Sequence, residues 1–239
     1  MKNKDLFICS ILCLTIISFS HNIFGQRPKY GTTAMGLTEL MEALYDPLNS
    51  PVNMLRYSDI KGTPYLHSEF QEGELLTLDS VLYKGIFFRY DIYGDAIEFK
   101  SNGNELVIGN TTNINYIQIQ DDVFHRINYF NKNKLKGGYF KLLVDGSCNL
   151  YAKYSVDFYN KKEPAAYSRA EPARFGDIKC NYYINFKTDS KPILIKNKKQ
   201  LLTLLARKET EMASFFKQYK IKVSKEDDLV QLIEFYNSL

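Results

Sequence analysis

The chain has 239 residues and a formal net charge of +4 at pH 7, from 31 Lys and Arg against 27 Asp and Glu. The charge is interspersed: residues 26–190 carry 19 basic and 20 acidic side chains, a net charge of −1. Binding to a nucleic-acid backbone needs a concentrated positive field, so this balance argues against a nucleic-acid partner.

The first 25 residues have the pattern of an export signal. Lys2 and Lys4 precede an uncharged apolar run from Leu6 to Phe19, and a short, more polar tail follows. We predict a signal peptide over residues 1–25, and a mature protein that is periplasmic or secreted. The apolar run is short for a bilayer, so no stable membrane span is expected after cleavage. An uncleaved membrane anchor is the alternative.

Residues 26–64 are expected to form an N-terminal helix and a connecting arm. Apolar residues from Leu37 to Tyr45 have the spacing of one helix face, and Asp46-Pro47 ends the pattern. In the arm that follows, we expect Met54-Leu55 and Ile60 to pack on the core.

Residues 65–196 have the period of an antiparallel sheet. In Val81–Gly109, apolar and mixed positions alternate, and the turn signals Gly94-Asp95 and Asn102-Gly103 divide the stretch into three strands of a β-meander. Further strands are predicted at Glu74–Leu78, Ile114–Ile119, Val123–Phe130, Tyr139–Val144, Cys148–Phe158, Cys180–Phe186 and Ile193–Ile195. Asn131–Gly138 is expected to be a polar hairpin loop, and Tyr159–Asp177 is the longest irregular stretch.

Residues 197–239 change to a helical period. Three groups of apolar residues follow the cap candidates Asn197, Thr210 and Ser224, the last with Asp227 in a capping-box arrangement. Two or three amphipathic helices are expected to pack on the sheet and complete the same domain. The predicted fold is α+β: an antiparallel curved β-meander sheet or partial barrel of about 8–10 strands, with C-terminal helices packed on it.

Residues that commonly support catalysis are scarce after residue 25. Only His67 and His125 remain, and the pair of His67 with Glu69 has no third ligand in sight. His125 alternates with core positions and is expected to be hydrogen-bonded within the fold. Phosphate-binding glycine loops do not occur in the sequence. We therefore predict no catalytic residue, no metal site and no cofactor.

Paired carboxylates and cysteines leave two questions open. Asp91 with Asp95 and Asp121 with Asp122 are explained by turn chemistry, although a glycosidase can use acids that are distant in sequence. Two cysteines, Cys148 and Cys180, lie in predicted strands. In an oxidising compartment they can form a disulfide if their strands are neighbours, and two buried thiols are the alternative.

Several segments carry a resemblance to a known family. They are Lys61-Gly62-Thr63-Pro64-Tyr65-Leu66, Arg89-Tyr90-Asp91-Ile92-Tyr93 with Glu98-Phe99, Glu226-Asp227-Asp228-Leu229 and the closing Glu234-Phe235-Tyr236-Asn237-Ser238-Leu239. In these segments the chain resembles an uncharacterised family of exported Bacteroidota proteins. The resemblance implies lineage and compartment, and it implies no activity and no catalytic residue.

Three functional hypotheses follow. The first is an exported non-enzymatic protein that uses its sheet, or the stretch Tyr159–Asp177, to bind a protein or envelope component. The second is a carrier that holds a lipid or other apolar ligand in a cavity of the curved sheet. The third and least supported is a hydrolase that acts on an envelope polymer.

Overall fold

The computed structural model of the chain describes residues 29–30, 44, 57, 60–163, 170–206 and 209–239. The strands of this part are β1 (Lys29–Tyr30), β2 (Gln71–Thr77), β3 (Val81–Asp91), β4 (Ala96–Ser101), β5 (Asn104–Val107), β6 (Ile114–Ile119), β7 (Asp122–Asn131), β8 (Lys134–Val144), β9 (Cys148–Tyr159), β10 (Arg174–Phe186) and β11 (Ile193–Leu194). The helices are α2 (Lys198–Leu204), α3 (Glu209–Tyr219) and α4 (Glu226–Ser238). The predicted α+β class is therefore confirmed.

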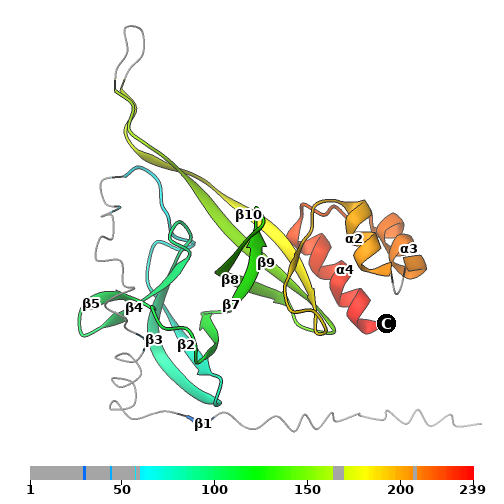
Figure 1. Cartoon of the computed structure of the whole chain (residues 1–239), viewed down its shortest axis with the longest axis horizontal. Coiled ribbons are helices and arrows are strands. Elements are labelled where there is room, and N and C mark those ends of the chain that lie inside the picture. The colour runs from blue at the N-terminus through cyan, green and yellow to red at the C-terminus, as the bar shows by residue number, and fades with distance from the viewer. Residues whose placement is uncertain (1–28, 31–43, 45–56, 58–59, 164–169, 207–208) are drawn as a thin grey trace, which may run out of the picture.

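The strands form one curved sheet with the helices at one end and β2 to β5 at the other (Figure 1). Along the sheet the order is β11-β10-β9-β8-β7-β6-β2-β3-β4-β5, and β1 lies beside β3. Neighbours on this path are antiparallel, whereas β1 pairs with β3 in parallel. In the described part of the chain β11 and β5 remain at separate edges, so the sheet is open and does not close into a barrel.

The predicted meander is confirmed, but one neighbouring prediction is wrong. Val81–Gly109 contains β3, β4 and β5, as its alternation indicated. The stretch Asn131–Gly138 is not a loop, because β7 and β8 are joined by Lys132 and Asn133 alone, at φ angles of 46° and 63°. Two residues with positive φ make the tight turn that fits the twist of paired strands. The polar residues that follow belong to an exposed part of β8, where no apolar alternation is required.

The irregular stretch predicted at Tyr159–Asp177 is shorter than expected at its C-terminal side. β10 begins at Arg174, which pairs with Tyr159, and Phe175 pairs with Phe158. The register shifts between Phe175 and Ile178, and this bulge interrupts the alternation by which a strand is recognised in the sequence.

Helix starts were predicted with mixed success. Asn197 caps α2 as expected, because its side chain accepts the N–H of Gln200 at 2.9 Å. α3 begins before Thr210, and the residue that precedes α4 is Lys225, which makes no side-chain cap bond. The capping box at Ser224 is therefore wrong. None of the described helices is long and apolar enough to cross a membrane.

The N-terminal predictions fall mostly outside the described residues. This applies to the signal peptide and to the helix at Leu37–Tyr45, except that Leu44 is buried and its carbonyl accepts the N–H of Gly109 at 3.0 Å. Ile60 packs against the same buried cluster as Leu44, as predicted, whereas Met54-Leu55 of the same prediction lies outside the described residues.

The buried side chains gather in three clusters. The first fills the curve of β2 to β7 and includes Phe88, Phe99, Phe124 and Ile117. The second joins the helices to β8, β9 and β10, and includes Leu150, Ile184, Phe216, Leu229 and Leu232. The third is aromatic and consists of Tyr129, Phe140, Tyr151 and Tyr183. One continuous sheet therefore supports several separate cores.

β8 and β9 separate part-way along their length. Their pairing extends from the β8–β9 turn only to Lys141 and Ala152. Beyond that point the N–H of Tyr139 donates to Asp95 of the β3–β4 turn, at 3.2 Å, and Asp95 also pairs with Lys153 of β9. The carboxylate of Asp95 thus satisfies a strand N–H that β9 does not reach.

Asn237 fixes α4 to the β8–β9 turn. Its Oδ1 accepts the N–H of Cys148 and the hydroxyl of Ser147, and its Nδ2 donates to the carbonyl of Cys148, each at 2.9 Å. Gly146 of the same turn lies against this amide: a Cβ there would come within 2.2 Å of Nδ2. The turn and the helix therefore fit only while residue 146 has no side chain.

Candidate functional site

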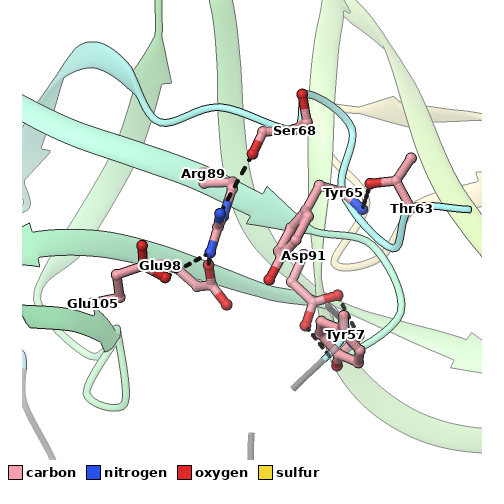
Figure 2. A network of polar contacts seen from close by, with 9 residues as sticks. Tyr57, Thr63, Tyr65, Ser68, Arg89, Asp91, Glu98 and Glu105 are labelled. Carbon is pink, nitrogen blue, oxygen red and sulfur yellow. Dashed lines mark hydrogen bonds and ion pairs between the residues drawn. The ribbon is translucent and has the colours of Figure 1, made fainter. Parts of the chain in front are cut away.

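A polar network joins β3, β4 and the segment that precedes β2 (Figure 2). Arg89 donates to Oε2 of Glu98 from Nε and Nη2, at 2.8 and 2.6 Å, and from Nη2 to Glu105 at 3.0 Å. Arg89 and Glu98 are direct cross-strand partners, which explains why their side chains meet. The guanidinium lies over the rings of Tyr65 and Phe70, 3.9 and 4.1 Å from their centroids.

Asp91 extends this network toward the β3–β4 turn. Its Oδ1 accepts the N–H of Gly94 at 3.0 Å, and its Oδ2 accepts the hydroxyl of Tyr57 at 3.3 Å. A Cβ at Gly94 would lie 2.6 Å from Oδ2 of Asp91, so a side chain there would displace the carboxylate. The turn explanation that the sequence suggested for Asp91 agrees with these contacts.

Burial is the largest cause of the pKa shifts in the network. It raises the pKa of Glu98, and the hydrogen bonds from Arg89 offset only part of the shift. Burial likewise raises the pKa of Asp91, and it raises the pKa of Tyr65 to about 12. One oxygen of Glu98, Oε1, is buried without a hydrogen-bond partner. A cavity lined by Arg89, His67 and Glu69 has a volume of about 10 Å³, which is room for a water molecule and not for a substrate.

A second polar cluster surrounds Lys153, which is 6% exposed. Its Nζ lies 2.5 Å from Oδ1 of Asp95 and 3.2 Å from the hydroxyl of Tyr90, which itself donates to Asp95 at 2.8 Å. Burial lowers the pKa of Lys153, and the carboxylate of Asp95 opposes this shift. A lysine with a lowered pKa can act as a nucleophile. Here the amine is enclosed and ion-paired, so the cluster connects β9 to the β3–β4 turn.

The two histidines lie in different surroundings. Nδ1 of His125 is 3.2 Å from the carbonyl oxygen of Asn115, which confirms that it is hydrogen-bonded within the fold, and burial lowers its pKa. His67 and Glu69 line the small cavity beside Arg89. Within the residues that the structure describes, no three His, Cys, Asp or Glu side chains are placed to hold a metal ion.

The two cysteines lie on neighbouring strands but at different levels. The register of β9 and β10 places Cys148 opposite Phe186 and Cys180 opposite Tyr154, and both thiols are free. The offset of six residues along β10, from Cys180 to Phe186, corresponds to about 20 Å, whereas a disulfide needs Cα atoms within about 7 Å. A disulfide is therefore incompatible with this register. The alternative of two buried thiols holds for Cys148, whereas Cys180 is only partly buried. Burial raises the pKa of Cys148 to about 12.

An open hollow of about 430 Å³ lies between α3 and α4. The ring of Phe215 in α3 stacks on the ring of Phe235 in α4, with centroids 4.3 Å apart and an angle of 16° between the planes. The centroid of the Tyr219 ring lies 4.4 Å from that of Phe215. Tyr219 is 48% exposed. The full lining consists of Thr210, Glu211, Ser214, Phe215, Gln218, Tyr219 and Phe235. The hollow is far larger than the cavity beside Arg89, and it has room for a ligand.

The sequence predicts the apolar faces of these helices but not the hollow. Phe215 and Tyr219 belong to one predicted apolar stripe, and Phe235 stands out only as part of the closing segment. Their ring stack depends on how α3 packs on α4, which no local pattern encodes. A usable signal is the row Thr210, Ser214 and Gln218, a polar line beside the aromatic one.

The segments that carry the family resemblance have structural roles in this fold. Tyr65, Arg89, Asp91 and Glu98 meet in the first polar network, and Asn237 holds the β8–β9 turn. Comparisons with family models, with curated proteins and with solved structures gave no match. A functional proposal therefore rests on the geometry of this chain.

Proposed function

We propose that this chain is an exported, non-enzymatic binding protein, and that the hollow between α3 and α4 binds a component of the cell envelope. The observation that carries the proposal is the hollow itself: about 430 Å³, open to solvent, with stacked rings and a polar margin. A concave site with an apolar floor and a few polar groups is the usual form of a ligand site.

The polar networks give less support to an enzymatic function. Arg89 is paired with Glu98 and Glu105, and Lys153 is paired with Asp95, so these charges are used within the fold. Among the described residues, the lining of the hollow contains one carboxylate, that of Glu211, and Tyr219 is its other ionisable side chain. General acid–base hydrolysis of a glycan uses two carboxylates. The hydrolase hypothesis therefore remains the least supported.

The carrier hypothesis is the second candidate, and the curved sheet gives it little support. The aromatic cluster of the sheet is packed by its own rings, with Tyr129, Phe140 and Tyr183 at centroid distances of 5.0 to 6.1 Å. An apolar ligand would have to displace these rings. Solvent extraction of the purified protein followed by mass spectrometry tests this candidate, and a bound apolar species at fixed stoichiometry would favour it.

The binding proposal can be tested with a pair of neighbouring substitutions on α3. Ser214 is exposed and lines the hollow, so Ser214→Arg fills it with a long side chain. Ala213 is exposed on the same helix and is not among the described lining residues, so Ala213→Arg is the matched control for the added charge and side-chain length.

The assay is cosedimentation of the mature protein with envelope fractions from the organism that encodes the chain. We expect the wild type and Ala213→Arg to bind and Ser214→Arg to lose binding. Equal binding by the two variants would refute the hollow as the site, and failure of the wild type to bind would refute the envelope as the target.

The export part of the proposal has its own test. Mass spectrometry of the protein recovered from its host should show Gln26 as the first residue, in the periplasm or the medium. A retained segment of residues 1–25 would contradict signal-peptide cleavage and favour the membrane anchor.

A further inference from the structure

We infer that the ligand of the hollow between α3 and α4 is a saccharide, a short oligosaccharide segment of an envelope glycan. This inference rests on the proposed binding function and names the chemical class of its ligand. Among the described residues, the lining consists of three aromatic and four polar side chains. Sugar rings combine apolar C–H faces with many hydroxyl groups, so they need this combination of partners.

The aromatic side chains supply the apolar part of the site. Phe215 stacks on Phe235 and contacts Tyr219, so the three rings form one connected group across both helices. Tyr219 is half exposed and gives this group its largest surface toward solvent. A rigid ring offers contact area at low entropic cost, and the phenol adds a hydrogen-bonding hydroxyl.

The polar side chains form a row beside the rings. Thr210, Ser214 and Gln218 follow each other at intervals of four residues, so they lie along one side of α3 over a length of about 12 Å. Within the part of the chain that the structure describes, none of the three has a hydrogen bond or ion pair to another side chain. Two hydroxyls and an amide can both donate and accept, which matches the hydroxyls of a sugar.

Glu211 adds a charge that distinguishes between ligand classes. Its carboxylate can accept hydrogen bonds from two neighbouring hydroxyls, and charge-assisted bonds of this kind are the stronger ones. Among the described residues of the lining there is no Lys or Arg, and the carboxylate of Glu211 would repel the negative charge of a phosphate-rich ligand. The saccharide is the class that uses both the rings and the polar row.

The test separates the ligand class from the binding function. The envelope that binds the wild-type protein is divided into polysaccharide, protein and lipid fractions, and each fraction competes for binding of the whole chain. We expect the polysaccharide fraction to compete, and its competition to disappear after acid hydrolysis to monosaccharides.

The possible results each decide something. Competition by the protein or lipid fraction alone would overturn the saccharide inference and leave the binding function standing. If the intact envelope does not bind at all, both fail.

Substitutions of Tyr219 test the role of the rings in the same assay. Tyr219→Ala should weaken binding about tenfold, because it removes the exposed ring, whereas Tyr219→Phe keeps the ring and should stay within about threefold of the wild type. Lys217→Ala, on the exposed side of α3 and outside the lining, is the control. Unchanged binding by Tyr219→Ala, with an unchanged circular dichroism spectrum, would overturn the inference.

Discussion

The contact of Asn237 with the β8–β9 turn gives a prediction about stability. Asn237→Ala removes three hydrogen bonds of 2.9 Å and leaves the N–H of the fully buried Cys148 without its partner. A net contribution of about 1 kcal/mol per bond gives a loss of about 3 kcal/mol in the free energy of unfolding. For a chain of this size, that corresponds to a fall of roughly 6–12 °C in Tm. Ser238→Ala, which removes only a bond to Phe235 of the same helix, should change stability by less than about 0.5 kcal/mol.

A double-mutant cycle with Gly146 tests the reasoning more strictly. Gly146→Ala alone should cost about 1–3 kcal/mol, because its Cβ would lie 2.2 Å from Nδ2 and 2.5 Å from Cγ of Asn237. In the Asn237→Ala background the obstructing amide is gone, so the same change should cost much less. Urea unfolding of the four proteins measures the coupling. If the two losses add within about 0.5 kcal/mol, the amide and residue 146 do not interact and the reasoning is refuted.

Three further predictions concern the polar and titratable groups. Arg89→Ala leaves the carboxylate of Glu98 buried without a cation, so it should lower the free energy of unfolding in urea by about 3–5 kcal/mol. Lys179→Ala breaks an exposed pair with Asp157 and should leave the urea midpoint unchanged. Equal effects of the two substitutions would contradict the view that burial makes the Arg89–Glu98 pair important. Burial raises the pKa of Tyr90, Tyr139 and Tyr154 above 10.0, so above that pH the unfolded chain releases protons that the folded chain retains. Stability should therefore fall as the pH rises from about 9 to 11, and a flat profile of urea midpoints would be evidence against this burial. Because Cys148 and Cys180 are far apart along β9 and β10, a reducing agent should not change Tm; a reductant-dependent fall would show that the two strands pair in another register.

Local patterns predicted the elements of this fold better than their partners. The alternation over Val81–Gly109 sufficed for three strands, because each is joined to the next by a short turn and pairs with it. The position of β2 between β6 and β3 was not predictable, since it depends on pairings between distant segments. The start of β8 was missed because its first residues are exposed and Gly137 and Gly138 interrupt the apolar alternation.

The site was harder to predict than the fold. Cys148 and Cys180 were correctly placed on strands, but the register that separates them is set by the whole β9–β10 pairing. The contact of Asp95 with Lys153 joins a turn to a strand 58 residues later, and no sequence spacing indicates it. The hollow is formed by side chains of both α3 and α4, and the sequence does not show that these helices pack together. The sequence therefore predicted most strands and helices and the pairing of strands joined by short turns, but not the contacts between distant segments.

The polar row of α3 has a consequence for how a family of such proteins would diverge. Thr210, Ser214 and Gln218 line the hollow but belong to none of the three buried clusters. Substitutions among them would alter the hydrogen-bonding surface while the rings beneath and the sheet stay in place. Related chains could then evolve different ligand preferences by changing a few exposed positions, with little of the loss in stability that normally limits new specificities.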